Sequence, residues 1–309
     1  ISMNLTNIRE TPLHEAFEAC RKSANQRGLR VTGSELVGLV PLSVMLEAGK
    51  YFLRQQRRSV GVSERELIRM AIKSLGLDEL SPFDPDQKII EYQLQKHYPK
   101  PLINMKLDAF ANETASESPA PGGGSIAAYV GALGISLGGM VANLSAHRRI
   151  WDDRWEEFSI HAEQAQQLKD QLLNLVDEDT NAFNRVMDAL RLPKGTEAEK
   201  TKRSQAIQAA TKYAIEVPLQ VMKVASDCFP LLHEMAQNGN PNSVSDAGVG
   251  ALCTRAAIHG AFLNVQINVG DYKDKVYVEQ VLAEGQALAD AADQQEQRIM
   301  GIVQGVMNE

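Results

Sequence analysis

Hydrophobic positions follow two different patterns along the chain. Residues 1–95 mix short β-like runs with helical periodicity, whereas residues 119–309 show helical periodicity and no convincing alternation of period two. Between them, residues 96–118 carry Pro99 and Pro101 followed by small polar residues, a composition typical of a linker. The pattern therefore predicts an α+β domain, a linker and an all-α domain.

The first domain is predicted to contain helices and several short strands. Ser63 and Glu66 have the spacing of a capping box, and Gly28 and Gly76 stand where a helix-ending glycine is expected. The helices are predicted at residues 12–27, 42–53 and 63–75. The strands are predicted at residues 1–5, 29–31, 34–41 and 83–92, the last of them at a sheet edge.

The second domain is predicted to be a bundle of long helices. Thr196 and Glu199 give one of these helices a capping box, and Pro218 should kink or break the same helix. Long helices with short joints favour an up-and-down bundle. The helices are predicted at residues 124–147, 152–192, 196–238, 243–269 and 273–307.

A glycine run stands immediately before the first long helix. Gly122, Gly123 and Gly124 are followed by Ser125 and a long apolar segment, which is typical of a loop that leads into a helix N-terminus. Glycine permits a positive φ and a close approach of a ligand, and a helix start offers unpaired N–H groups. A flexible linker explains the run equally well, and the run matches neither a phosphate loop nor a dinucleotide fingerprint.

Asp179 is the strongest candidate for chemistry. In helical spacing it shares a face with Val176 and Phe183, which are both expected to be buried. A carboxylate on such a face has a raised pKa, which suits general acid–base catalysis. The alternative is a solvated charge at the edge of the apolar stripe.

Four further polar residues suggest a ligand site. Asn240 and Asp246 belong to a dense polar turn that helix capping explains only in part. Asn264 and Asn268 lie one turn apart on a mostly apolar helix, so their amides need partners. Hydrogen bonds between helices explain these two amides as well as a ligand, or another subunit, does.

Arg148 and Arg149 end the first long helix. Cations at a helix C-terminus complement its dipole, and in a cleft they would instead hold an anionic substrate tail. The histidines show no metal-ligand spacing, and the cysteines lack the context of a nucleophile, so we predict no metal site.

Composition narrows the setting. The 309 residues are 44% hydrophobic, enough for two cores, and the net charge of −7 argues against a general nucleic-acid binder. Three dispersed cysteines fit a reducing cytoplasm. No signal peptide is visible, and glycines interrupt the best candidate for a membrane span. Because the first residue is Ile, we expect a processed chain or a piece of a longer protein.

The motifs together resemble the formiminotetrahydrofolate cyclodeaminase family from residue 113 to about residue 309. The resemblance rests on SPAPGGGSIAAYVGALGISLGGMVANL, DEDTNAFNRVMDALRLPKGTEAEK, GNPNSVSDAGVGA and NVQINV, in that order. The preceding segments TPLHEAFEACRKSA, VTGSELVGLVPL and IRMAIKSLGLDELSPFDPDQKIIEY are similar to the latter part of a glutamate formiminotransferase domain. That similarity implies a partial ferredoxin-like subdomain over residues 1–95.

The resemblance implies a dimeric all-α domain with sites at the subunit interface. It implies conversion of 5-formiminotetrahydrofolate to 5,10-methenyltetrahydrofolate and ammonia in histidine degradation and one-carbon metabolism. The family's catalytic aspartate falls on Asp179, its folate-contacting loop on Gly122–Ser125, and its polar turn on Asn240 and Asp246. We expect a homodimer or larger homo-oligomer, a polyglutamylated folate substrate and no tightly bound cofactor.

Other functions remain open. The transferase active site of the family lies upstream of Ile1, so we expect transferase activity from a full-length parent and not from this chain. Relatives with the same bundle act as methenyltetrahydrofolate cyclohydrolases, whose chemistry needs similar groups. A non-catalytic folate-binding or assembly module is the third possibility, although Asp179 on an apolar face argues against it.

Overall fold

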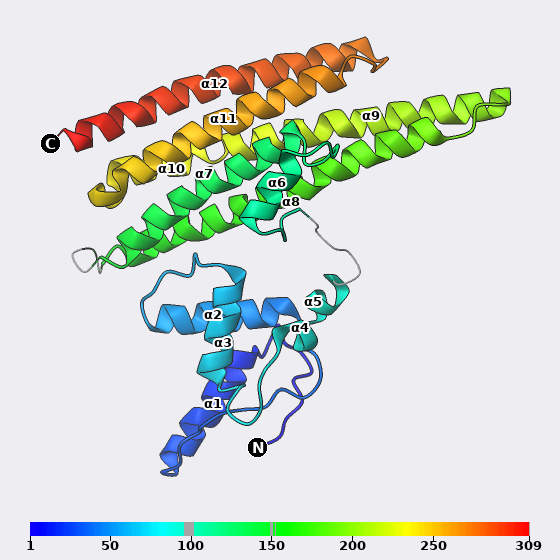
Figure 1. Ribbon diagram of the computed structural model, residues 1–309. Coiled ribbons are helices and arrows are strands. Elements are labelled where there is room, and N and C mark those ends of the chain that lie inside the picture. The colour runs from blue at the N-terminus through cyan, green and yellow to red at the C-terminus, as the bar shows by residue number, and fades with distance from the viewer. Residues whose placement is uncertain (96–101, 149–150, 152, 309) are drawn as a thin grey trace. The chain divides into compact units, whose positions relative to one another are not determined.

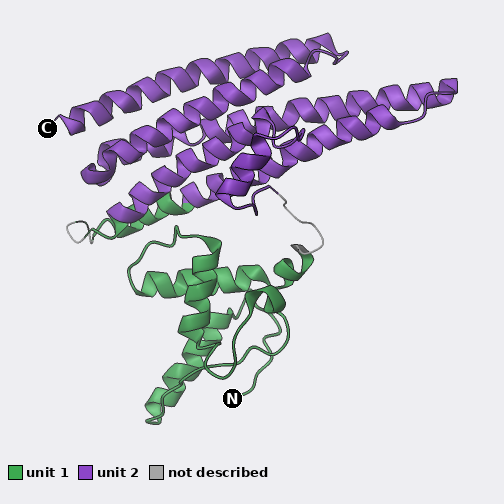
Figure 2. Ribbon diagram, in the orientation of Figure 1, with its two compact units in different colours: residues 1–99, 146–163 green, residues 100–145, 164–309 purple. Residues whose placement is uncertain are grey.

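A computed structural model describes residues 1–95, 102–148, 151 and 153–308. The chain divides into two compact units (Figure 2). The first unit comprises Ile1–Pro99 and Ala146–Glu163, and the second comprises Lys100–Ser145 and Gln164–Glu309. The described residues are mostly helical throughout (Figure 1).

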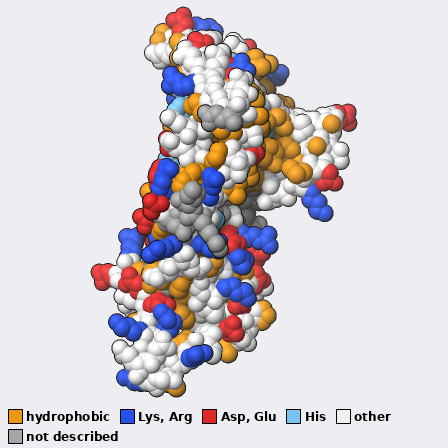
Figure 3. Space-filling model, turned by 90° about the vertical axis from the view of Figure 1, so that its left-hand side faces the viewer, with side chains coloured by type: hydrophobic (Ala, Val, Ile, Leu, Met, Phe, Trp, Pro, Cys, Tyr) orange, Lys and Arg blue, Asp and Glu red, His pale blue; other side chains and the backbone are white. Residues whose placement is uncertain are grey.

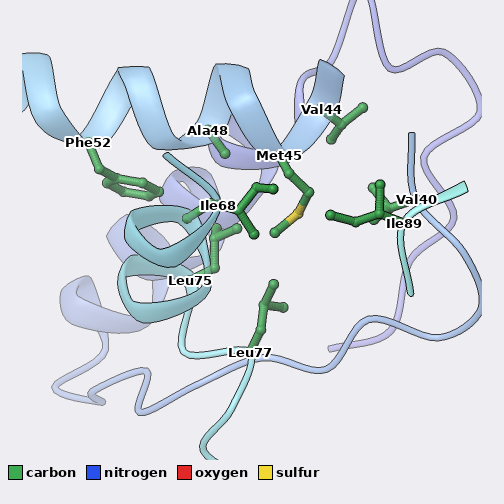
Figure 4. Close-up of a cluster of buried hydrophobic side chains, with 10 residues drawn as sticks. Val40, Val44, Met45, Ala48, Phe52, Ile68, Leu75, Leu77 and Ile89 are labelled. Atoms are coloured by element: carbon green, nitrogen blue, oxygen red, sulfur yellow. The ribbon is translucent and has the colours of Figure 1, made fainter. Parts of the chain in front are cut away.

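Helices form the N-terminal unit around a small apolar core. Met45 and Ala48 of one helix pack with Ile68 and Leu75 of another and with Ile89, and all five are almost fully buried (Figure 4). This burial of apolar surface is the main stabilising contribution to the unit. Its helices are α1 (Leu13–Gln26), α2 (Leu42–Gln55), α3 (Glu64–Leu75), α4 (Pro85–Lys88) and α5 (Ile90–Gln95).

The predicted helix ends of this unit are largely confirmed. The Ser63 side chain accepts a hydrogen bond from the Glu66 amide at 3.3 Å. The Glu66 carboxylate pairs with Arg69, so only half of the expected capping box forms. Gly76 ends α3 with φ of +61°, a left-handed conformation that glycine adopts without steric cost.

The predicted strands are wrong. Within residues 1–95, the single β-type contact is a parallel bridge between Val40 and Ile89. Residues 1–5, 29–31 and most of 34–41 are irregular, and α4 and α5 occupy most of residues 83–92. A β-strand needs a neighbouring strand for its backbone hydrogen bonds, and these runs find none among the described residues. The ferredoxin-like sheet is therefore absent from the described part of the unit.

The second unit is the predicted helical bundle. Its helices are α6 (Leu107–Thr114), α7 (Gly123–Ala146), α8 (Trp155–Arg191, which begins in the first unit), α9 (Glu197–Ser226), α10 (Phe229–Asn238), η2 (Pro241–Ser243), α11 (Val244–Asn268) and α12 (Lys275–Met307). The segment predicted as a linker contains α6. The helix predicted from residue 196 to 238 is divided at Asp227 and Cys228, and not at Pro218.

Small residues bring the bundle helices close together. A Cβ atom on Gly134 of α7 would lie 2.9 Å from the Gly250 carbonyl oxygen of α11. A Cβ atom on Gly139 would lie 2.9 Å from that of Ala165 in α8. These glycines therefore permit backbone contacts that any larger residue would push apart.

The length and composition of α7 would allow it to cross a membrane, although its glycines led us to expect no membrane span there. In the structure 61% of its most apolar window is buried inside the bundle, between α8 and α11. A buried core helix passes the same test of length and hydropathy, so this observation is weak evidence for a membrane span.

Candidate functional site

The start of α7 holds the Asp179 carboxylate of α8. The backbone N–H and the side-chain hydroxyl of Ser125 lie 2.8 and 2.9 Å from Asp179 Oδ2. The same hydroxyl lies 2.9 Å from the Val176 carbonyl oxygen, so its single proton has two acceptors within reach. Ser125 is completely buried, which fixes this geometry.

Gly124 is needed because Asp179 occupies the space of a side chain. A Cβ atom at Gly124 would lie 2.2 Å from Asp179 Oδ1. None of Gly122, Gly123 and Gly124 has a positive φ. Of the two properties of glycine that could matter here, the close approach to the backbone is the one that this structure uses.

Burial raises the pKa of the Asp179 carboxyl, and the two hydrogen bonds from Ser125 oppose this rise. Phe183, expected to cover Asp179, is 40% exposed, while Val176 on the other side is fully buried. Asp179 therefore lies where the buried stripe of α8 opens to solvent. A carboxyl with a raised pKa at an accessible edge is suited to accept and return a proton.

Asn264 of α11 completes this cluster. A Cβ atom on Gly123 would lie 3.2 Å from Asn264 Nδ2, which donates to the Gly260 carbonyl at 2.9 Å. The structure thus brings Gly123, Gly124 and Ser125 together with Asp179 and Asn264, from three helices that lie side by side in Figure 1.

Asn268 has a structural partner. Its Nδ2 atom donates to the Ala214 carbonyl of α9 at 2.7 Å. In a regular helix that carbonyl would accept from residue 218, but Pro218 has no N–H. Asn268 replaces the missing donor, which explains why α9 continues through Pro218.

Asn240 and Asp246 lie far from Asp179 within one chain. The backbone N–H of Asn240 donates to Ser145 Oγ at 2.8 Å, near the C-terminus of α7. Ser145 follows Ser125 by twenty residues of one helix, which corresponds to about 30 Å. Asp246 lies in the first turn of α11, beside this same turn.

Arg148 belongs to the other compact unit, where its guanidinium lies 4.8 Å from the centre of the Trp151 ring. This stacking is a cation–π contact. Arg149 lies outside the described residues.

Sequence reasoning missed two groups near Asp179. Asp177 is 7% exposed and its Oδ1 accepts from the Leu102 amide at 2.9 Å. Glu178 accepts from the Tyr213 hydroxyl and pairs with Arg185, and burial with this contact raises the pKa of Tyr213 to about 12. The acidic run at residues 177–179 was visible in the sequence, but its distant partners were not.

Residues 106–287 match the family described as formiminotransferase-cyclodeaminase, and residues 1–95 match the formiminotransferase domain. The chain belongs to the formiminotransferase-cyclodeaminase family. Formimidoyltransferase-cyclodeaminase from Rattus norvegicus is 37% identical to it over 97% of this chain. The chain spans 56% of the length of that relative.

Two further similar proteins each match about two thirds of this chain. Methenyltetrahydrofolate cyclohydrolase from Methylorubrum extorquens is 35% identical over 66% of this chain and 99% of its own length. The crystal structure of a formiminotetrahydrofolate cyclodeaminase from Thermotoga maritima superposes with a TM-score of 0.59, at 28% identity, over 66% of this chain and 98% of that one.

Proposed function

We propose that this chain carries formiminotetrahydrofolate cyclodeaminase activity, which closes 5-formiminotetrahydrofolate to 5,10-methenyltetrahydrofolate and releases ammonia. The observation that carries the proposal is the Asp179 carboxylate, held by Ser125 against Gly124 at the start of α7. The similarity to the Thermotoga maritima cyclodeaminase supports it.

The reaction needs one proton to move between two nitrogens. N10 attacks the formimino carbon, so the N10–C bond forms and the C=N double bond becomes single. The proton on N10 must then reach the former imino nitrogen, because the C–N bond breaks only when that nitrogen leaves as ammonia. The positive charge of the protonated formimino group ends on the methenyl product.

We assign this proton transfer to Asp179. As a carboxylate it accepts the N10 proton, and as an acid it returns the proton to the leaving nitrogen. Its raised pKa reduces the cost of holding the proton between the two steps. Ser125 fixes the orientation of the carboxylate, and the nearby Asn264 amide offers its Oδ1 atom as an acceptor for the substrate.

An Asp179→Asn variant tests the assignment. Turnover should fall about 100- to 10,000-fold, the usual range for a general acid–base group. Methenyl absorbance and released ammonia should be followed together, with enzymatically generated 5-formiminotetrahydrofolate. Wild-type turnover in a folded Asp179→Asn protein would exclude the proton-transfer role.

Methenyltetrahydrofolate cyclohydrolase is the second candidate, favoured by one observation. The chain covers 99% of the Methylorubrum extorquens cyclohydrolase, at 35% identity. Fast hydrolysis of methenyltetrahydrofolate without ammonia release from the formimino substrate would support it. Folate binding with neither reaction would support the non-catalytic module.

We propose that the helical unit forms a homodimer through an exposed apolar face. Side chains of α7 and α11 at helical spacing remain 38% to 76% exposed, an unusual state for large apolar groups. Figure 3 shows a band of hydrophobic side chains on the surface of the molecule. The apolar face comprises Leu133, Met140 and Leu144 of α7 and Val249, Leu252, Leu263 and Ile267 of α11.

A twofold axis across the apolar face would bring distant groups together. If that axis is perpendicular to α7, it places the C-terminal end of α7 in one subunit near the N-terminal end of α7 in the other. Asn240 and Asp246 would then join the Asp179 cluster of the partner subunit, which a single chain does not permit.

For the N-terminal unit we propose a part in glutamate formiminotransferase activity within a longer protein. Residues 1–95 match the formiminotransferase domain, and the chain spans 56% of its rat relative. The lone Val40–Ile89 bridge and the exposed Val37 and Leu39 are consistent with a segment that joins a ferredoxin-like sheet completed by other strands.

A further inference from the structure

Helix α8 extends beyond the N-terminal end of α7. Contacts between Gly131 and Leu172, and between Gly124 and Asp179, show that the two helices run antiparallel, with the start of α7 opposite Asp179. From there α8 continues to Arg191, about 18 Å further. Figure 1 shows α8 and α9 extending past the start of α7.

The stripe of α8 that α7 covers continues beyond it as open apolar surface. Leu172, Val176, Asp179, Phe183 and Leu190 share one face at helical spacing. The first two are fully buried, whereas Phe183 and Leu190 are 40% and 42% exposed. An apolar strip therefore leads outward from the Asp179 carboxylate.

A cationic hollow lies at the outer end of this strip. It has a volume of about 390 Å³, and none of its lining residues is acidic, although the chain has a net charge of −7. The Arg203 guanidinium in it lies 3.0 and 3.2 Å from the Leu190 carbonyl oxygen, which joins the hollow to the strip. The lining residues are Lys194, Lys200, Arg203, Ser204, Ile207, Gln208 and Lys273.

The positive charge of the hollow is only partly compensated. Lys200 pairs with Glu197 at 2.7 Å, and the Lys273 ammonium contacts the neutral Ser204 hydroxyl at 3.1 Å. The Glu199 carboxylate receives the amides of Gly195 and Thr196. Lys194 has no ionic partner among the residues that the structure describes. An anion in the hollow would therefore lie near ammonium groups that have no carboxylate partner in the described part of the chain.

We propose that the cationic hollow binds the glutamate carboxylates of the folate substrate, while the strip formed by Phe183 and Leu190 contacts its aromatic part. The inference rests on the proposed function. The acid and the apolar strip follow one another along α8, and the cations lie beyond its end, in the order in which the reacting nitrogens, benzoyl ring and carboxylates follow one another along folate. It places the tail at the α8–α9 joint, and not at Arg148.

The distance from Asp179 to the cationic hollow sets the number of glutamates that the substrate needs to reach it. Asp179 and Leu190 are separated by about 16 Å along α8. Standard covalent dimensions put the first glutamate α-carbon roughly 8 Å from N10. A single glutamate therefore falls short of the hollow, and additional γ-linked glutamates reach it. Affinity should rise with tail length through these cations.

Equilibrium binding of 5-formyltetrahydrofolate, with one or with three glutamates, tests this subsite. A Lys194→Gln/Lys200→Gln variant should lose at least about fivefold in affinity for the triglutamate and less than twofold for the monoglutamate. Phe183→Ala should weaken both ligands by the same factor. Lys212→Gln/Lys223→Gln, with both lysines on α9, is the charge-matched control and should bind both ligands as the wild type does.

Other outcomes contradict the subsite. Unchanged triglutamate affinity in the Lys194/Lys200 variant would overturn it, as would the same tail-length loss in an Arg148→Gln variant. Wild-type protein that releases ammonia from the formimino substrate would leave the proposed function intact in either case. Wild-type protein that binds neither ligand would overturn both proposals.

Discussion

At the scale of single residues, the site depends on one carboxylate and on the absence of one side chain. Asp179 lies against the start of α7 because Gly124 leaves room for its oxygen, and Ser125 supplies two hydrogen bonds to it. The sequence suggested both groups, and the structure shows that Gly124 serves the close approach without a positive φ.

Replacement of Gly124 by alanine should remove activity without unfolding the protein. The new Cβ atom would overlap Asp179 Oδ1 and displace the carboxylate, and misplacement by about 1 Å costs on the order of 100-fold in rate. Steady-state turnover and thermal unfolding should be measured together. Gly301→Ala is the control, because a Cβ atom there meets nothing within 4 Å.

The raised pKa of Asp179 predicts opposite effects of pH on activity and on stability. Turnover should fall as the pH drops through that raised pKa, at a higher pH than the ordinary value of 3.8, because the protonated acid cannot accept the N10 proton.

Stability should move the other way. The folded state binds this proton more tightly than the unfolded state, so the Asp179 contribution is largest in acid and declines as the pH rises through the folded pKa. Asp179→Asn should remove that part of the pH dependence of the free energy of unfolding. An identical pH profile in both proteins would contradict the raised pKa.

At the scale of helices, a side chain from one element repairs the backbone of another. The Asn268 amide supplies the donor that Pro218 denies to Ala214. The sequence showed a proline inside a helix and an amide on an apolar face as separate anomalies. Only their proximity in space shows that each explains the other.

This pairing predicts a strong coupling between two substitutions. Asn268→Ala alone should destabilise the fold by about 1 kcal/mol, because a partly buried carbonyl loses its partner. In a Pro218→Ala background the regular helical amide returns, so the same change should cost clearly less. Denaturant unfolding of the four proteins measures the coupling, and strictly additive effects would refute it.

At the scale of the whole molecule, the helical unit presents an apolar face that a second copy would cover. A charge in the middle of this face should block the proposed dimer. We expect Leu133→Glu to sediment as a monomer at micromolar concentrations at which the wild type sediments as a dimer. Gln280→Glu adds the same charge on an exposed position of α12 and should leave the dimer intact. A monomeric wild type would contradict the proposal.

The sequence by itself determined the long helices, the capped starts at Ser63 and Thr196, and Asp179 as the residue to test. These follow from local spacing and capping, which need only neighbours along the chain.

Tertiary structure decided the rest. The strand-like runs of residues 1–95 stay irregular because a strand exists only with a partner strand. The Asn268 side chain bonds to the α9 backbone, and the length of α7 separates Asn240 from Asp179. Both facts depend on which helices pack together and in which register. Contacts of that kind are set by the burial of apolar surface over the whole bundle, and no local pattern contains them.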